Sequence, residues 1–170
     1  MPFKPKKAAS ICALALAAVA VSAAIAICAV FPNKYADSVN AAADEFGLDR
    51  ALVRSVVWAE SKFDAAAQSG KGAVGLMQLM PETYGQCAAA LYINAPSDGR
   101  SDPDVNLRCG CYYLSLLMDR FDGDTEAALM AYNAGEQNAR RFLSGETVFP
   151  ETAAYLKKIA LARRVYGFFG

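Results

Sequence analysis

The sequence contains no histidine among its 170 residues, and its 17 basic residues are balanced by 17 acidic residues. Without histidine there can be no Ser-His-Asp triad, no Cys-His pair and no metal site with an imidazole ligand. Three of the basic residues, Lys4, Lys6 and Lys7, and none of the acidic ones precede residue 32, so residues 32–170 alone carry a net charge of −3. A domain of this charge is a poor candidate for binding nucleic acid, which requires a basic surface.

A long run without charged residues follows the N-terminal lysines. It comprises 24 residues, which as a helix would extend about 36 Å, against about 30 Å for the hydrocarbon core of a membrane. Basic residues that flank a membrane span usually stay in the cytoplasm. We therefore predict a cytoplasmic tail over residues 1–7, a transmembrane anchor over residues 8–31 and an extracytoplasmic domain over residues 32–170.

A cleaved signal peptide is the alternative interpretation of the same segment. Ala24-Ile25-Ala26 has the small-x-small pattern of a cleavage site. The apolar run is longer than the core of about 7–15 residues that signal peptides usually have, which favours the anchor. Either interpretation exports residues 32–170.

The exported part contains three of the five cysteines, Cys87, Cys109 and Cys111. An odd number allows at most one disulfide within the domain, from Cys87 to Cys109 or Cys111. Buried free thiols, packed as small apolar side chains, are the alternative. Three thiolates cannot complete a four-cysteine zinc site, and we expect no metal.

Apolar residues recur at helical spacing in most of the exported part, which predicts a mainly α domain with at most a minor β element. Asp49 is expected to cap one helix, and Asp104 to cap another after a polar loop over residues 94–104. Residues 62–76 are rich in glycine and predict a loop or a small hairpin. Besides the helix after Asp49, we expect helices over residues 35–46, 81–91, 105–121, 125–132, 136–143 and 151–166.

Glu60 is the polar residue that stands out in this pattern. It follows the apolar run Val56-Val57-Trp58-Ala59 and directly precedes the glycine-rich loop. A carboxyl group in apolar surroundings has a raised pKa, which is what a general acid working near neutral pH requires. On its own, however, such a glutamate is more often a solvated residue at the end of a helix.

An ordered set of short motifs accompanies this glutamate: Glu60-Ser61, Ser69 with Gly72-Ala73, Gly75-Leu76-Met77-Gln78 with Pro81, Ala131-Tyr132-Asn133-Ala134-Gly135, and Glu151-Thr152 with Tyr155. In this order they closely resemble the soluble-lytic-transglycosylase (SLT) domain of the goose-type-lysozyme-like superfamily, over most of the exported part. The resemblance implies a lysozyme-like fold and a peptidoglycan substrate. It also implies cleavage of the β-1,4 bond between N-acetylmuramic acid and N-acetylglucosamine without water.

The resemblance further implies roles for individual residues. Glu60 matches the catalytic glutamate, and Ser69 matches a loop serine that helps to orient the substrate and the glutamate. The remaining matches are groove residues that bind substrate: Met77, Gln78, Tyr132, Asn133 and Glu151. Core packing is the alternative for Met77 and Tyr132, and it is the role expected of Tyr113 and Tyr155.

The sequence has no second carboxylate within a motif, although glycosidases usually use two. One glutamate suffices if it first protonates the bridging oxygen and then accepts the proton of the C6 hydroxyl group of the muramic acid. That hydroxyl closes on C1 and gives a 1,6-anhydro end. No metal or organic cofactor is then needed. A hydrolytic muramidase of the same fold, in which water replaces the hydroxyl, and a catalytically silent wall-binding module are the alternatives.

The expected partners follow from these inferences. They are the glycan strands of peptidoglycan and, through residues 8–31, a membrane. No nucleic acid is expected, and the sequence does not indicate any protein partner.

Overall fold

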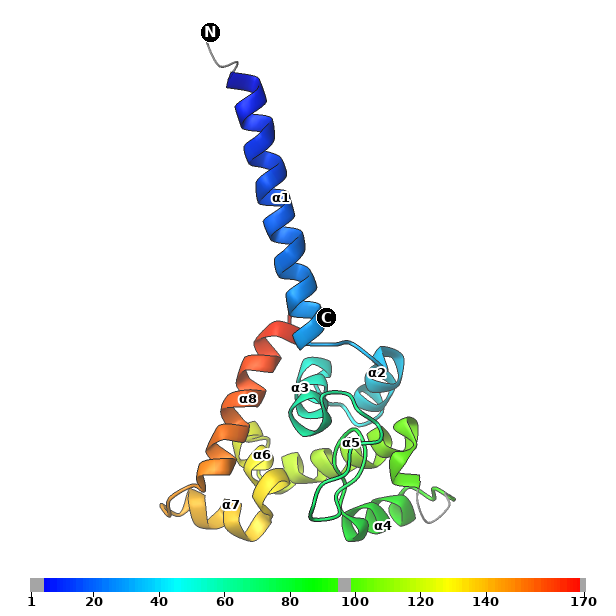
Figure 1. The fold of residues 1–170 in the computed structure, drawn as a ribbon. Coiled ribbons are helices and arrows are strands. Elements are labelled where there is room, and N and C mark those ends of the chain that lie inside the picture. The colour runs from blue at the N-terminus through cyan, green and yellow to red at the C-terminus, as the bar shows by residue number, and fades with distance from the viewer. Residues whose placement is uncertain (1–4, 95–98, 169–170) are drawn as a thin grey trace. The chain divides into compact units, whose positions relative to one another are not determined.

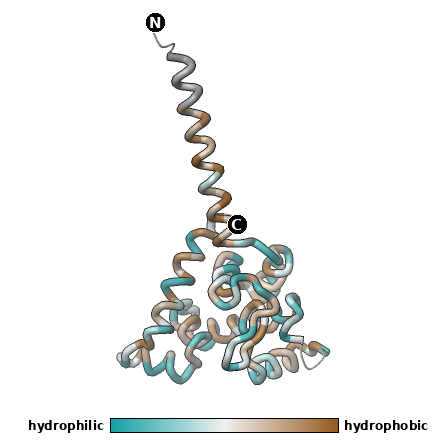
Figure 2. Tube along the Cα trace, viewed as in Figure 1, coloured by the Kyte–Doolittle hydropathy of each residue, from teal (hydrophilic) through white to brown (hydrophobic). Residues whose placement is uncertain are grey.

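The computed structural model describes residues 5–94 and 99–168, with only the backbone described for residues 5–11. The chain divides into two compact units, Met1–Pro32 and Asn33–Gly170. Helix α1, Pro5–Val30, makes up the first unit as far as it is described. Its segment Cys12–Val30 is long and apolar enough to cross a membrane, and Figure 2 shows how few hydrophilic residues interrupt it.

The second unit consists of helices joined by loops, as Figure 1 shows. Its described part has no named strand, only two isolated β-bridges, Gln68 to Val74 and Val74 to Leu79, in the loop after α3. The mainly α class that the sequence predicts is therefore confirmed. The helices are α2 (Ala36–Glu45), α3 (Arg50–Ser61), α4 (Pro81–Ala90), α5 (Pro103–Arg120), α6 (Thr125–Ala134), α7 (Glu136–Leu143) and α8 (Pro150–Tyr166), with one 3-10 turn, η1 (Gly99–Ser101).

Helix α3 is largely buried in the core of the second unit. Val53, Val56 and Val57 on this helix have no exposed surface, and α3 packs most extensively against α8. As expected, Asp49 caps its N-terminus, because the carboxylate accepts a hydrogen bond of 2.7 Å from the backbone N–H of Leu52. Lys62, in the left-handed conformation with φ +53°, ends the helix and starts the loop over residues 62–80.

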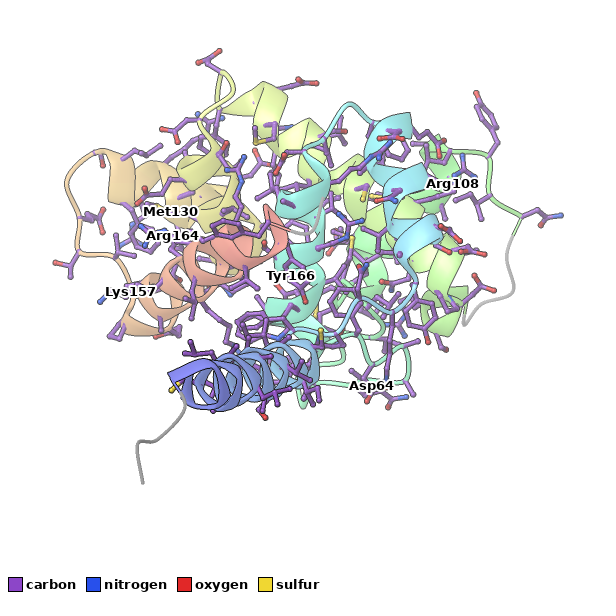
Figure 3. The ribbon with its side chains drawn as sticks, turned by 90° about the horizontal axis from the view of Figure 1, so that it is seen from above. Asp64, Arg108, Met130, Lys157, Arg164 and Tyr166 are labelled. Carbon is purple, nitrogen blue, oxygen red and sulfur yellow. The ribbon has the colours of Figure 1, made fainter. Side chains whose placement is uncertain are left out.

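Two apolar clusters hold the other helices around α5. Leu117 on α5 packs with Ala128 and Ala131 on α6 and with Phe142 on α7. Nearer the N-terminus of α5, Cys109 packs with α4 through Tyr84, Cys87 and Ala88. An ion pair on the surface joins α5 to α2, because Arg108 (labelled in Figure 3) donates to Glu45 at 2.8 Å.

The prediction that Asp104 caps the long helix is wrong. Asp102 is the cap, since its carboxylate accepts a hydrogen bond of 3.0 Å from the backbone N–H of Val105. Pro103 is the first helical residue, a position where no N–H is needed. Asp104 lies in the first turn instead, where its charge is favourable next to the helix N-terminus. Residues 95–98 of the predicted polar loop lie outside the described residues.

The three cysteines of the second unit are buried free thiols, which agrees with the second of the two alternatives left by the sequence. Burial raises the pKa of the Cys87 thiol to about 12 and that of the Cys109 thiol to about 11. Cys109 belongs to the same apolar cluster as Cys87. Burial also raises the pKa of Cys111 to about 12, and the nearby charge of Glu45 adds to this rise.

Candidate active site

Glu60 lies in the last turn of α3, and its carboxyl group is largely screened from water. Burial raises its pKa from 4.5 to about 7, whereas a hydrogen bond with Tyr155 and the positive charge of Lys158 lower it by less. Near neutral pH both the protonated and the ionised form of Glu60 are therefore populated. Elsewhere, hydrogen bonds from arginine lower the pKa of Asp44, Glu45 and Glu146. Glu60 thus has the pKa of a group that can both donate and accept a proton.

Two buried phenol groups lie within electrostatic reach of this carboxyl. Burial and then the charge of Glu60 raise the pKa of both Tyr132, from α6, and Tyr155, from α8, well above the ordinary value. The Tyr132 hydroxyl donates a hydrogen bond of 2.8 Å to the backbone carbonyl of Met77. The Tyr155 hydroxyl interacts with the Glu60 carboxyl, and this interaction lowers the pKa of Glu60 and raises that of Tyr155.

The side chain of Asn106 on α5 holds the loop over residues 62–80 in place by hydrogen bonds to its backbone. The Asn106 side chain is fully buried, and its oxygen accepts a hydrogen bond of 2.8 Å from the backbone N–H of Met77. Its amide nitrogen donates to the carbonyls of Val74 at 3.0 Å and Arg100 at 2.8 Å. A Cβ atom on Gly75 (φ +88°) would lie 2.3 Å from the Asn106 nitrogen, so the close approach requires glycine.

The two methionines on either side of Gln78-Leu79 have opposite environments. Met77 has no exposed surface and packs so closely on α5 that a Cβ atom on Gly110 would lie 2.3 Å from its sulfur. Met80 is 41% exposed and lines a cleft. The core-packing alternative therefore describes the Met77 side chain, which cannot touch a substrate in this conformation. The residue contributes to the site through its carbonyl group instead.

The cleft has a volume of about 230 Å³ and lies between the loop, α4, α5 and α6. Of the residues predicted from the sequence, it brings together Gln78, Tyr132 and Asn133. The amide nitrogen of Gln78 donates to the carbonyls of Ala67 and Gly75, at 3.1 and 3.0 Å. Asn133 accepts a hydrogen bond of 3.0 Å from the Thr152 hydroxyl. The other lining residues are Leu79, Met80, Thr83, Tyr113, Ala131 and Gly135.

The other predicted residues do not line this cleft. Glu60 is near enough to Tyr132, which lines the cleft, for its charge to raise the pKa of the Tyr132 phenol. Ser69 is exposed, and its hydroxyl accepts a hydrogen bond of 3.0 Å from the backbone N–H of Ala73, within the same loop. Glu151 is exposed in the first turn of α8, next to Thr152.

Four residues near Glu60 or in the cleft have roles that the sequence does not indicate. Met80 and Thr83 belong to no motif with an implied role, and Tyr113, expected to pack, lines the cleft with its ring 5.4 Å from that of Tyr132. Tyr155 forms part of a motif, yet it too is expected only to pack. Its interaction with Glu60 becomes apparent only when α8 is placed against α3.

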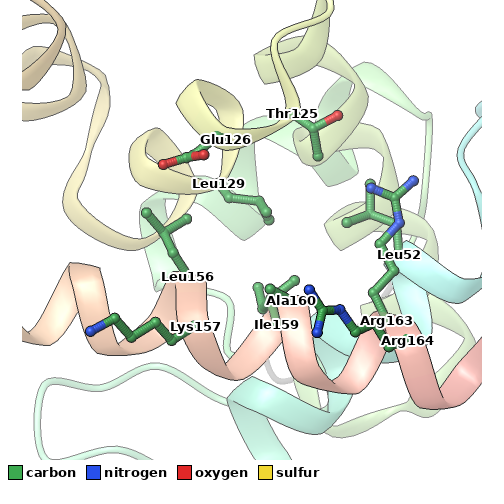
Figure 4. Close-up of a pocket in the computed structure, with 10 residues that line it drawn as sticks. All are labelled: Leu52, Thr125, Glu126, Leu129, Leu156, Lys157, Ile159, Ala160, Arg163 and Arg164. Carbon is green, nitrogen blue, oxygen red and sulfur yellow. The ribbon is translucent and has the colours of Figure 1, made fainter.

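A larger pocket, of about 610 Å³, lies between α3, α6 and α8 and contains none of the predicted site residues. Figure 4 shows its apolar floor, formed by residues such as Leu129 and Ile159, and the charged side chains of Lys157 and Arg164 at its edge. Because this pocket holds none of the residues that the motifs single out, we place the candidate active site at Glu60 and the smaller cleft.

Comparisons with known proteins agree with this choice of site. The model of the transglycosylase SLT domain family matches residues 37–151. The chain is 32% identical to the peptidoglycan transglycosylase gp16 of Escherichia phage T7 over 126 residues, which is 74% of this chain and 9% of the phage protein. It is 31% identical to the membrane-bound lytic murein transglycosylase C of Edwardsiella ictaluri over 124 residues, 67% of this chain and 34% of that protein.

Solved structures show the same fold. The lytic transglycosylase Slt of Pseudomonas aeruginosa, solved as an inactive glutamate-to-glutamine mutant, has a TM-score of 0.76 and 32% identity, covering 81% of this chain and 24% of that chain. The 70 kDa soluble lytic transglycosylase of Escherichia coli also has a TM-score of 0.76, with 25% identity, covering 82% of this chain and 25% of that chain. This chain therefore spans only a minor part of the relatives it matches.

Proposed function

Because the chain belongs to the transglycosylase SLT domain family, we propose that it is a lytic transglycosylase of peptidoglycan. Its relatives carry the names peptidoglycan transglycosylase and membrane-bound lytic murein transglycosylase. The proposed reaction breaks the β-1,4 bond between N-acetylmuramic acid and N-acetylglucosamine and leaves a 1,6-anhydro end. The observation that carries the proposal is the partly buried Glu60 carboxyl, with its pKa of about 7, beside a cleft.

In the proposed mechanism, Glu60 acts twice. Its protonated form donates to the bridging oxygen as the glycosidic bond breaks, and the 2-acetamido group of the substrate stabilises the positive charge that develops at C1. The ionised Glu60 then accepts the proton of the C6 hydroxyl group, whose oxygen closes on C1. A pKa near neutral suits both steps, because the same group must lose and regain its proton in each cycle.

We assign the binding of the sugar rings to the side chains around the cleft. The side-chain carbonyl of Gln78 and the side-chain amide of Asn133 are the groups we assign to sugar binding, because the Gln78 amide nitrogen and the Asn133 oxygen already bind within the domain. The exposed Met80 provides an apolar contact. Ser69 and Glu151 lie outside this cleft, and we propose that they contact parts of the glycan strand beyond it. The oxygen that Tyr132 contacts belongs to Met77, which connects the phenol group to the loop that carries Gln78.

Mass spectrometry of the products released from purified peptidoglycan by the full-length protein tests this function. A lytic transglycosylase gives anhydro ends, whose mass is lower by one water than that of the ends left by hydrolysis. Reducing ends would show that the enzyme is a muramidase of the same fold. Binding to peptidoglycan without any released product would show a silent wall-binding module.

We expect Tyr132→Phe to impair both stability and activity. The change leaves the buried Met77 carbonyl without its partner, which costs about 1–3 kcal/mol. The carbonyl belongs to the loop beside Gln78, so this part of the cleft is held less firmly. If the same free energy is lost in the transition state, turnover should fall about 10- to 100-fold. The measurement pairs the thermal midpoint with the rate of release of soluble glycan.

Tyr112→Phe is the matched control for this experiment. Tyr112 belongs to the same domain, but its ring packs against that of Phe46 at 5.7 Å and it does not line the candidate cleft. Its change should leave turnover at the parent level. Full turnover in Tyr132→Phe, together with a lowered midpoint, would show that Tyr132 is a core residue only.

We also propose that α1 anchors the protein in a membrane, with residues 32–170 outside the cytoplasm. The apolar segment Cys12–Val30 supports this, as do the relatives that are named membrane-bound lytic murein transglycosylases. Protease added to cells without a wall should then digest the domain, and washing without detergent should leave the full-length protein in the membrane. A soluble mature protein that begins near Ala26 would instead identify a cleaved signal peptide.

A further inference from the structure

Lys158 is held beside the catalytic carboxyl by a contact that the sequence does not suggest. Its ammonium group donates to the backbone carbonyl of Ala59 at 3.3 Å, across 99 residues of chain. Ala59 directly precedes Glu60 in the last turn of α3. The contact therefore brings a fixed positive charge next to the group to which we assign both proton transfers.

The orientation of α8 explains why this lysine, and not its neighbour, faces Glu60. Tyr155 and Lys158 are three residues apart and hence on the same side of the helix, and this side meets α3. Lys157 points to a different side, where it lines the pocket between α3, α6 and α8, as Figure 4 shows. Two adjacent lysines thus have different surroundings.

The charged and titratable groups that act on Glu60 can be named for each element packed against it. From α8 they are Tyr155 and Lys158, and from α6 the phenol group of Tyr132. Both phenols have a pKa well above the ordinary value and are neutral at physiological pH. Among the described residues, Lys158 is the one full positive charge that acts on Glu60.

We propose that Lys158 is a positioning residue of the reaction, which stabilises the carboxylate that Glu60 becomes between the two proton transfers. This proposal rests on the proposed function, in which Glu60 is the acid and then the base. Burial alone would make Glu60 a weak acid that keeps its proton. The ammonium group, fixed by the Ala59 carbonyl, favours the ionised form and so helps the first proton to leave.

A purely structural role would have different consequences. The Ala59 carbonyl belongs to the C-terminal turn of α3, and a lysine at such a turn can satisfy a free carbonyl and interact with the helix dipole. Loss of that role alone would lower the thermal midpoint slightly. It would not change the pH at which kcat falls as Glu60 loses its proton.

The experiment compares Lys158→Met, Lys158→Arg and the control Lys157→Met in the full-length protein. For each, kcat and KM for soluble glycan release are measured across the pH range, together with the thermal midpoint. Since Lys158 is exposed, all three variants are expected to fold. Lys158→Met should lower kcat about fivefold, which is the effect expected from the loss of one exposed charge pair, and it should leave KM unchanged.

The pH profile gives the decisive result. Without the positive charge the pKa of Glu60 rises further, so the alkaline limb of kcat should move to higher pH in Lys158→Met. Lys158→Arg keeps the charge and should restore both the limb and the rate, and Lys157→Met should match the parent. A profile of Lys158→Met that coincides with that of Lys157→Met would overturn the proposal, whatever the midpoint shows.

Failure of the proposed function would look different. In that case the parent protein itself would release no anhydro products, or would keep its activity when Glu60 is changed. The proposal for Lys158 fails only if the parent shows a Glu60-dependent reaction and the Lys158 variants leave its pH profile unchanged.

Discussion

Glu60→Gln will abolish glycan cleavage and at the same time make the domain more stable at neutral pH. Glutamine keeps the shape of the side chain but has no proton to transfer. General acid–base catalysis usually contributes about 10²- to 10⁴-fold, and here one group serves both steps, so the loss should reach the upper end or exceed it. No released product should be detectable from purified peptidoglycan.

The gain in stability follows from the raised pKa. In the unfolded chain Glu60 loses its proton near its ordinary pKa of 4.5, whereas in the folded domain it loses it near pH 7. The folded state thus holds the proton more tightly, so Glu60 lowers the stability of the domain progressively as pH rises between these values, and by a constant amount above them. Over that interval the loss amounts to at most about 3 kcal/mol, which glutamine avoids.

Thermal midpoints of the parent and Glu60→Gln, measured at an acidic and at a mildly alkaline pH, check this prediction. The difference between the two proteins should be small at the acidic pH and large at the alkaline one. Glu126→Gln is the control, because Glu126 is exposed and lines the pocket that lacks the site residues. Substantial lysis by Glu60→Gln would exclude the mechanism with a single acid, and a pH-independent difference would contradict the burial of the carboxyl.

Asn106→Leu will destabilise the domain more than any other single change considered for the site. Leucine has a similar size but removes three hydrogen bonds. It leaves the N–H of Met77 and the carbonyl of Arg100 without the Asn106 partner, whereas the Val74 carbonyl keeps its bond from the backbone N–H of Leu79. Each buried group left unsatisfied costs about 1–3 kcal/mol. A loss of about 3–5 kcal/mol is a large part of the stability of a typical domain and should lower the midpoint by about 10–20 °C.

Asn138→Leu provides the comparison. Asn138 is only partly buried, and its side chain donates one hydrogen bond of 2.9 Å, to the Ala134 carbonyl, within its own helical region. Its change should therefore cost about 1 kcal/mol or less. If the two variants had equal midpoints, Asn106 would not be what fixes the loop on α5.

The sequence predicts the helices well because their periodicity and end signals agree. The predicted bounds of α7 are those observed, and Asp49 caps α3 as expected. The misplaced cap of α5 arises because Asp102 and Asp104 flank the same proline, and both residue types are suitable caps. The position of Pro103 at the first turn decides between them, since the residue before it is favoured in the extended conformation of a cap.

The environment of the site was harder to predict, because it depends on which side chains face each other across the fold. Met77 and Met80 lie only three residues apart, and the positive φ of Gln78, +49°, between them reverses the chain in a way that periodicity does not reveal. Lys157 and Lys158 are adjacent and identical in type. Only the packing of α8 on α3 brings Lys158, and not Lys157, to Glu60.

The hydrogen bonds of Asn106 also affect how much the loop must become ordered when a ligand binds in the cleft. The loop over residues 62–80 has little regular secondary structure, and such loops usually lose conformational entropy when they close on a substrate. Here one buried side chain fixes the backbone of the loop on its inner side, at Val74 and Met77, while Tyr132 fixes the Met77 carbonyl. Much of the ordering has therefore taken place during folding. In the proposed reaction, the binding free energy of the glycan would then remain available for distorting the sugar ring toward its transition state.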